Sequence, residues 1–384
     1  MNMNEQMKES EESILHTYNR FPVVFEKGQG CYLYDSEGKE YLDFAAGIAV
    51  NSLGYHYPGY DEALKDQIDK LMHMSNLYYN EPIIEAGAKL VKASKMSKAF
   101  FTNSGTEAIE GALKAAKKYA YVRDGHADHE IIAMNHSFHG RSIGALSVTG
   151  TAHYREPFEP LMGGVKFADF NDLESVKAQI TDKTCAIITE VVQGEGGIYP
   201  AKKEFLEGLR QICDEKDIML IFDEIQCGMG RTGHYFAWQA YGVQPDIMTS
   251  AKALGCGVPV GAFVLNEKVA KASLEPGDHG TTYGGNPFVC AAVSKVFDIY
   301  ENDKIIEHVQ EMTPYLEQKL DEIVAKHECA ATRRGMGFMQ GIVIQGRPVG
   351  EVVKAALAKG LLVISAGSDV LRIVPPLVIT KEHI

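Results

Sequence analysis

The sequence predicts an α/β fold in which helices cover both faces of a mostly parallel sheet. Short apolar strands alternate with helices along the middle of the chain, which is the pattern of parallel strands joined by crossover helices. The segments 184–190 (TCAIITE) and 218–224 (IMLIFDE) are almost wholly apolar, whereas a strand with one face in water alternates polar and apolar residues. We therefore expect a large domain on such a sheet and a smaller α/β domain after it.

Length and composition limit the kind of protein this can be. The 384 residues, 45% of them hydrophobic, can bury a sizeable core, and the formal net charge of -13 makes nucleic acid an improbable partner. The seven cysteines are scattered and include no CxxC pair, which predicts reduced thiols in the cytosol rather than disulfides or a zinc site. The N-terminal segment is polar and acidic, and no apolar run approaches about 18 residues, so we expect neither a secretory signal nor a membrane span.

The N-terminal part of the chain predicts a small antiparallel meander. Aromatic and polar residues alternate over 25–44, with breaks at Gly28 and Gly30 and a turn at 35–38. A glycine-rich stretch at 45–60 follows, and it either approaches a ligand closely or is ordinary loop punctuation. The apolar spacing then predicts a helix from about Asp61 to Met74, with an apolar face that includes Leu71.

A strand at 98–103 (KAFFTN) leads directly into a long helix that opens with Ser104, Gly105 and Thr106. Hydroxyl groups and unpaired N–H groups at a helix N-terminus form an anion site, although a serine or threonine there is also an ordinary N-cap. The stretch lacks the GxxxxGK[ST] pattern of a nucleotide-binding P-loop. The sequence leaves both interpretations open at this position.

A second strand, 130–135 (EIIAMN), ends in the loop HSFHGRS, where two side chains suit ligand binding. Arg141 could hold a carboxylate through two hydrogen bonds, and Phe138 could stack on a flat ring or simply pack in the core. We expect His136 and His139 to be surface residues, because no third metal ligand stands at a suitable spacing. We predict no metal site.

Two further segments supply an acid and a base. Asp223 and Glu224 end an apolar strand, and Lys252 lies among the small residues of MTSAKALGCGVPVG at 248–261. A partly desolvated lysine loses its proton more readily and can attack a carbonyl group, although it can also be a lysine that extends to solvent from a helix start. Carboxyl ends of parallel strands meet at one edge, so the loops at 103–106, 135–141, 193–197 and 223–226 should share one crevice.

The C-terminal part predicts a separate α/β unit. A strand-like segment at 257–266 precedes a glycine-rich loop, DHGTTYGGNP, which runs into a helix at Pro287. Residues from about 297 to 376 then give helix, strand, helix and two short strands. We divide the chain into an N-terminal segment at 1–50 that packs with the small domain, a large domain at 51–290 and a small domain at 291–384.

These parts fit one kind of chemistry. An amino-transfer catalyst built on pyridoxal phosphate needs a lysine, an anion site, a carboxylate beside the pyridine nitrogen and a side chain that stacks on the ring. Lys252, the start of the helix at Ser104, Asp223 and Phe138 could supply these four parts. Asp223 comes from an apolar strand, so it is a poorly hydrated carboxylate that would favour a nearby pyridinium.

The same segments identify a family. NSGTEA, HSFHGRS, VVQGEGG, LIFDEIQCGMGRTG, MTSAKALGCGVPVG and TTYGGNP resemble, in order and spacing, the class III (ornithine-type) aminotransferases of fold type I. The resemblance extends from about Phe25 to Ile379. LDFAAGIAVNSLGYHYP and the HGTTYGGNP loop favour the members that act on N2-acetylornithine. Relatives usually continue into a final helix where this chain stops at KEHI, so we expect either a clipped chain or a shortened small domain.

The resemblance implies a role for each residue in the motifs. Lys252 would form a Schiff base with pyridoxal 5'-phosphate and then move the proton, while Asp223 would pair with the ring nitrogen. The other residues that would contact the cofactor are Ser104, Gly105 and Thr106 at the phosphate, Phe138 on the ring, Gln226 at the phenolic oxygen, and Glu224 and Ile225 beside it. Thr282 would complete the phosphate site of a neighbouring subunit, with Thr281 near the substrate. This sharing implies a homodimer.

The resemblance also implies the reaction and its substrate residues. The expected activity is transfer of the amino group of N2-acetyl-L-ornithine to 2-oxoglutarate in arginine biosynthesis, with Arg141 on the donor and Arg372 on the keto acid once Glu195 releases it. Without the resemblance to this family, the sequence would predict that Glu195 and Arg372 are surface charges. Ornithine, succinylornithine, succinyl-diaminopimelate and 4-aminobutyrate stay open as donors. An aminomutase is disfavoured by the Glu195 and Arg372 pair, and a silent pyridoxal-binding protein by Lys252.

Overall fold

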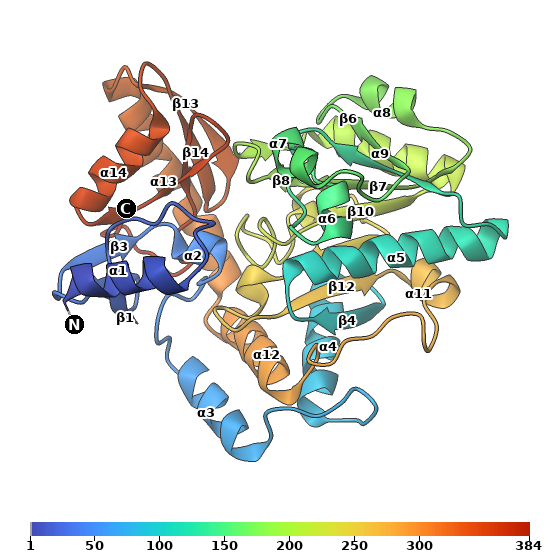
Figure 1. The fold of residues 1–384 in the computed structure, drawn as a ribbon, viewed down its shortest axis with the longest axis horizontal. Coiled ribbons are helices and arrows are strands. Elements are labelled where there is room, and N and C mark those ends of the chain that lie inside the picture. The colour runs from blue at the N-terminus through green and yellow to red at the C-terminus, as the bar shows by residue number, and fades with distance from the viewer. Residues whose placement is uncertain (1) are drawn as a thin grey trace.

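The computed structural model describes residues 2–384, and a seven-stranded sheet forms its centre (Figure 1). Its strands, in spatial order, are β4 (Lys98–Thr102), β12 (Gly261–Leu265), β11 (Ile247–Ser250), β10 (Met219–Asp223), β7 (Thr184–Glu190), β5 (Glu130–Met134) and β6 (Val165–Ala168). Neighbours from β11 to β6 are parallel, and β12 is antiparallel to both β11 and β4. The predicted α/β fold with a mostly parallel sheet is confirmed.

Helices bury both faces of this sheet, which explains why its strands are apolar along their length. On β10, Ile221 packs into the hydrophobic cluster that contains α5 (Gly105–Asp124). Its neighbours Leu220 and Phe222 pack into the cluster on the opposite face, which contains α9 (Lys203–Lys216). Successive residues of a strand point to opposite faces, so a strand that is buried on both faces shows no polar alternation.

Two smaller four-stranded sheets lie together on one side of the large sheet (Figure 1). In the first, the predicted meander of β1 (Phe25–Gln29), β2 (Tyr32–Asp35) and β3 (Glu40–Asp43) is extended by β15 (Leu361–Leu362), which is parallel to β3. The second has the order β13 (Ala330–Met336), β14 (Met339–Ile344), β17 (Val370–Ile373) and β16 (Ile364–Ala366). The sequence had not predicted β13, because its polar residues Thr332, Arg333 and Arg334 interrupt any apolar run. The domain boundaries stay a prediction.

The remaining elements connect these sheets. The helices are α1 (Met3–Ser13), α2 (Ala46–Ala49), α3 (Tyr60–Lys70), α4 (Glu81–Ser94), α6 (Ile143–Ser147), α7 (Ala152–Arg155), α8 (Leu173–Gln179), α10 (Trp238–Tyr241), α11 (Glu267–Ala272), α12 (Pro287–Asn302), α13 (Ile305–Lys326) and α14 (Val349–Ala358). Two 3-10 turns, η1 (Glu156–Phe158) and η2 (Lys252–Leu254), and the short pair β8 (Val192–Gln193) and β9 (Tyr199–Pro200) complete the fold. Within residues 2–384, no helix is long and apolar enough to cross a membrane.

The helix predicted from Asp61 to Met74 is shorter than expected. It ends at Lys70, because Leu71 adopts an extended conformation at the C-cap. Its apolar face is only partly buried within the chain: Leu64 packs against the core, whereas Ile68 and Leu71 are 48% and 44% exposed. The apolar spacing therefore identified an apolar face, of which the part at Ile68 and Leu71 is exposed.

Close contact between α5 and the sheet requires a glycine at position 111, where no side chain separates the two. A Cβ atom at this position would lie 2.2 Å from a ring carbon of Phe263 on β12, and Phe263 is itself buried and stacked on Phe100. We expect Gly111→Ala to destabilise the protein by about 1–3 kcal/mol through overpacking. Gly350→Ala is the matched control, because Gly350 is also helical but has nothing within 4 Å, so the change should be neutral or stabilising by at most about 1 kcal/mol. Thermal melting of the two variants tests this, and equal melting temperatures would contradict the packing argument.

Candidate active site

A cavity of about 480 Å³ lies where the parallel strands end. Its walls come from the segments that follow β4, β5, β7, β10 and β11, as the crevice prediction required. The predicted site residues that line it are Ser104, Gly105, Thr106, Phe138, Arg141, Asp223, Ile225, Gln226 and Lys252. The loop at 193–197 lines a neighbouring cavity instead, of about 870 Å³.

Lys252 occupies the first position of η2, immediately after β11. Its backbone is in the left-handed region, with φ of 48°, and the flanking Ala251 and Ala253 are buried. Burial lowers the pKa of the Lys252 ammonium group below its ordinary value; nearby Glu195 raises this pKa and Arg372 lowers it. Because a lowered pKa increases the fraction of neutral amine, Lys252 can act as a nucleophile and as a base.

Asp223 ends β10, and three neighbours contact its carboxyl group. Its carboxylate accepts hydrogen bonds from the Ile225 N–H at 3.0 Å and the Thr249 hydroxyl at 3.2 Å, and its Oδ2 lies 2.7 Å from Nδ1 of His139. Thr249 is directly opposite Asp223 in the register of β10 and β11. Such partners are what a buried carboxylate requires, and Asp223 is only 4% exposed.

His139 corrects the sequence prediction, which placed both histidines of the loop on the surface. His136 is exposed, but His139 is 2% exposed and contacts Asp223. The loop after β5 turns inward at this residue, where the His139 N–H donates to the Thr149 hydroxyl at 3.0 Å. The two partners are 84 residues apart, so no local pattern could have indicated this contact.

The start of α5 has the features of an anion site. Ser104 is the N-cap, and its hydroxyl accepts from the Glu107 N–H at 3.3 Å, so the capping interpretation is correct for this residue. The N–H groups of Gly105 and Thr106 then have no intrahelical acceptor and stay available at the positive end of the helix. A Cβ atom at Gly105 would lie 2.9 Å from the terminal Cδ1 of Ile225, so a larger residue would require that side chain to move.

Arg141 is exposed but held in position by aromatic rings. Its guanidinium carbon lies 4.1 Å from the ring centroid of Tyr154 and 5.4 Å from that of Phe138. Tyr154 lies on α7, which the sequence had not predicted, so this partner was missed. The arrangement leaves the guanidinium edge free to bind a carboxylate.

Glu195 and Arg372 form an ion pair although 177 residues separate them. Nη1 of Arg372 lies 2.5 Å from Oε1 of Glu195 and 3.2 Å from Oε1 of Gln226, and Nη2 donates to the Ser365 carbonyl at 3.1 Å. Arg372 is 3% exposed, which rules out a surface charge. The pair connects β17 of the C-terminal part with the loops of the central sheet.

Besides Glu195 and Arg372, which do not line the cavity, three further predicted residues lie outside it. The Glu224 carboxylate accepts hydrogen bonds from the N–H groups of Ala237 and Trp238, both at 2.8 Å, and burial raises the pKa of Glu224 to about 7. Thr281 accepts from the Asn103 amide at 3.2 Å, and Thr282 is exposed. The Glu224 side chain is therefore occupied elsewhere, and the threonines do not reach the cavity of their own chain.

Glu190 is a cavity residue that sequence reasoning did not select. It ends β7 and lies opposite Asp223 in the register of β7 and β10, with 5% exposure. Its carboxyl group accepts from the N–H groups of Phe138 at 3.4 Å and Gly194 at 3.3 Å. Burial and the charge of Asp223 raise the pKa of Glu190 well above its ordinary value. A signal was present, because the strand at 184–190 ends in an acid as the strand of Asp223 does.

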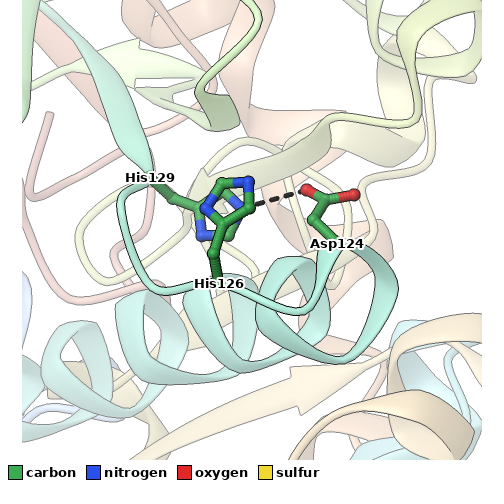
Figure 2. Close-up of side chains that lie close together, drawn as sticks. All are labelled: Asp124, His126 and His129. Atoms are coloured by element: carbon green, nitrogen blue, oxygen red, sulfur yellow. Dashed lines mark hydrogen bonds and ion pairs between the residues drawn. The ribbon is translucent and has the colours of Figure 1, made fainter.

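A cluster of Asp124, His126 and His129 lies away from the cavity at the end of α5 (Figure 2). Its possible ligand atoms are within 4.8 Å of one another, but both Asp124 oxygens already accept from Arg123 at 2.6 Å, and Nε2 of His129 lies 2.9 Å from the same carboxylate. The two imidazole rings are stacked with an interplanar angle of 11°, so their nitrogen lone pairs run parallel rather than converge. We therefore assign the cluster to holding the end of α5 against the start of β5.

Comparisons with known proteins identify the family of the chain. Residues 14–384 match the family aminotransferase class-III. An acetylornithine aminotransferase from Clostridium acetobutylicum is 48% identical over 376 residues, covering 98% of this chain and 97% of that protein. A succinylornithine transaminase from Yersinia pseudotuberculosis is 44% identical, covering 97% of this chain and 92% of that protein. The crystal structure of ornithine aminotransferase from Toxoplasma gondii aligns with a TM-score of 0.95 at 29% identity, covering 100% of this chain and 92% of that chain.

The ion pair at the cavity should control the proton affinity of Lys252. Glu195 stabilises the Lys252 ammonium group and Arg372 destabilises it, so Glu195→Gln should lower the Lys252 pKa further. Labelling of Lys252 by a small amine-reactive reagent, followed by mass spectrometry across a pH series, should then have its midpoint at lower pH than in the wild type. Glu174→Gln, at an exposed glutamate on α8, is the control and should leave the midpoint in place. A midpoint that moves to higher pH in Glu195→Gln would refute the electrostatic argument.

Proposed function

Because the chain belongs to the class-III aminotransferase family, we propose that it transfers the terminal amino group of N2-acetyl-L-ornithine to 2-oxoglutarate. The products are N-acetyl-L-glutamate 5-semialdehyde and L-glutamate, in a step of arginine biosynthesis. The observation that carries the reaction type is the cavity in which Lys252 and Asp223 share walls with a helix N-terminus and a guanidinium group. The choice of donor is supported by the acetylornithine aminotransferase that is 48% identical along nearly the whole chain.

Pyridoxal 5'-phosphate suits the residues of the cavity. The free N–H groups of Gly105 and Thr106 suit a phosphate, Phe138 offers a ring face, and the buried Asp223 carboxylate suits a protonated ring nitrogen. The side chain of Gln226 lines the same cavity and suits the phenolic oxygen. When bound, this cofactor supplies a carbonyl carbon that condenses with amines and a ring that withdraws electrons.

Lys252 is the residue that we propose for covalent attachment and proton transfer. Its lowered pKa gives a neutral amine that can attack a carbonyl carbon, and the same amine would later take a proton from the substrate carbon and deliver it to the cofactor carbon. The left-handed backbone at Lys252 and the small residues around it place the amine at the cavity wall. An exposed lysine would be protonated and solvated at neutral pH and could do neither.

Asp223 would pair with the positively charged nitrogen of the cofactor ring, and His139 contacts the Asp223 carboxyl group. The imidazole contacts Oδ2 and Thr249 contacts Oδ1, so the carboxylate cannot rotate freely. A fixed, poorly hydrated anion stabilises a nearby cation more strongly than a solvated one does. We propose His139 as a residue that positions Asp223.

Two arginines would receive the carboxylates of the two substrates. Arg141 faces solvent between Phe138 and Tyr154 and would bind the α-carboxylate of the donor. Arg372 is paired with Glu195 and would bind the α-carboxylate of 2-oxoglutarate when Glu195 moves away. This pair favours a transaminase over an aminomutase, because an aminomutase uses no second keto acid.

Ornithine and succinylornithine are the donors that compete with acetylornithine. A succinylornithine transaminase is 44% identical to this chain, and an ornithine aminotransferase has nearly the same fold at 29% identity. Succinyl-diaminopimelate and 4-aminobutyrate are further alternatives. We favour acetylornithine because the relatives with that name reach higher identity over the same length.

We further propose a homodimer in which each subunit completes the site of the other. Leu77 and Tyr79 are 86% and 94% exposed, and this apolar segment lies beside the loop of Thr282 because the Asn76 amide donates to the Gly284 carbonyl at 2.8 Å. Large exposed apolar patches mark protein interfaces. An interface here would bring Thr282 of one subunit toward the second cavity. A cytosolic location stays a prediction from the cysteine usage.

A panel of ω-amino donors tests the proposed activity. The purified protein, given 2-oxoglutarate and one donor at a time, should turn over acetylornithine with a higher kcat/KM than ornithine, succinylornithine, succinyl-diaminopimelate or 4-aminobutyrate. Discrimination by the acyl group should be about 10–200-fold, the range that pocket contacts with a small apolar group supply. Equal or better turnover of another donor would make that donor the substrate.

Lys252→Ala is the control for this panel. It should abolish turnover with every donor and remove the absorbance of the lysine-bound cofactor, because no other amine replaces Lys252 at the cavity wall. Retention of that absorbance in the variant would show that the cofactor is held by another residue.

The dimer proposal predicts a coupled loss of assembly and activity. Tyr79→Glu places a charge on the apolar segment and should shift the protein toward monomers in analytical ultracentrifugation, with a parallel loss of turnover. Tyr121→Glu is the control, because Tyr121 is exposed on the last turns of α5, away from the Thr282 loop, and should leave the assembly unchanged. A fully active monomeric Tyr79→Glu would contradict shared sites.

A further inference from the structure

Glu190 is a buried acid that lines the cavity, and the proposed reaction assigns it no role. Its two carboxyl oxygens go to different loops: Oε2 accepts from the Phe138 N–H and Oε1 from the Gly194 N–H. We call residues 135–142 the Phe138 loop and residues 193–197 the Glu195 loop. Glu190 is therefore a single side chain that joins both loops from beneath, at the end of β7.

The two loops that Glu190 joins are packed together and carry different parts of the proposed site. A Cβ atom at Gly196 would lie 2.7 Å from the His136 carbonyl oxygen, and the Gln193 amide donates to the Asn135 carbonyl at 3.0 Å. The Phe138 loop holds the ring face and the donor arginine, and the Glu195 loop holds the acid that masks Arg372. A change in the position of one loop must therefore affect the other.

The strength of the Glu190 contacts depends on charge. Asp223 lies opposite on the next strand, and the other titratable or charged groups around them are His139, Lys252, Glu195 and Arg372. Burial and the charge of Asp223 raise the pKa of Glu190 well above its ordinary value, which favours the neutral form, and a neutral carboxyl group is a weaker acceptor than a carboxylate. The two contacts are accordingly long, at 3.3 and 3.4 Å. A cation placed against Asp223 would offset the repulsion and allow Glu190 to ionise.

We propose that Glu190 is a positioning residue that ties the Phe138 loop to the Glu195 loop, and that the tie tightens when a cation lies against Asp223. This inference rests on the proposed function, in which a protonated cofactor ring supplies that cation. Binding of the cofactor would then draw the two loops together before the substrate binds. The same binding event would position both the Phe138 ring and the Glu195 carboxylate.

Hydrogen exchange at the two amides tests the proposal directly. Addition of pyridoxal 5'-phosphate to the full-length wild-type protein should slow exchange of the Phe138 and Gly194 N–H groups about three- to tenfold, the factor that one hydrogen bond of ordinary net strength supplies. Glu190→Gln has the same shape but cannot ionise, so this slowing should be lost while the absorbance of the bound cofactor shows that the cavity is loaded. Equal slowing in both proteins, or no slowing in the wild type, would overturn the tightening.

Two comparisons keep this test separate from the proposed function and from general destabilisation. Without cofactor, Glu190→Ala should exchange both amides faster than the wild type, and unchanged rates would overturn the tie itself, whether or not the protein binds pyridoxal phosphate. Failure of the wild type to bind the cofactor would count against the proposed function, and the Glu190→Ala comparison would still decide the tie. Glu224→Gln removes a similar buried carboxyl group and should affect the amides of Ala237 and Trp238 instead. Thermal melting confirms that each variant is folded.

Discussion

Burial of two carboxyl groups side by side, at the ends of β7 and β10, is the constraint on which the rest of the site depends. Two such groups cannot both ionise cheaply in a site with little water, so their surroundings must decide which one carries the charge. Asp223 has His139, Thr249 and the Ile225 N–H as partners. Glu190 has only two long contacts with backbone N–H groups. Asp223 thus has the better-partnered carboxyl group, and this asymmetry gives the cavity one fixed place for a cation.

The second constraint is the buried Arg372, which lies on β17 of the C-terminal sheet and not on the central sheet. A buried guanidinium group needs a paired anion, and Glu195 provides it across two parts of the chain. If Glu195 moves away, only another anion can take its place without leaving an uncompensated charge. In the proposed reaction the pair would therefore act as a selective binding site for a carboxylate, because a neutral ligand cannot replace Glu195. The position of β17 in the C-terminal sheet is what brings Arg372 to this point.

Sequence patterns predicted what is local, and failed where contacts join distant segments. The apolar strands, the start of α5 at Ser104 and the small-residue surroundings of Lys252 follow from residue order and hydrophobic periodicity. His139 was placed at the surface because nothing near it in sequence indicates Asp223. Glu224 was counted with Asp223, although adjacent residues at a strand end point to opposite sides, and this rule would have directed its side chain away from the cavity. Tyr154 and β13 were missed because a short helix and an exposed edge strand have weak apolar periodicity.

The two arginines of the site differ in a way that suits two substrates. Arg141 is exposed, so its charge is screened by water. The rings of Phe138 and Tyr154 fix the direction of the guanidinium group more than they increase its attraction for an anion. Arg372 is buried, so its attraction for an anion is strong but is already satisfied by Glu195. In the proposed reaction the donor can therefore bind at Arg141 without disturbing the buried pair. The keto acid must compete with Glu195, and it gains the stronger site only by displacing that carboxylate.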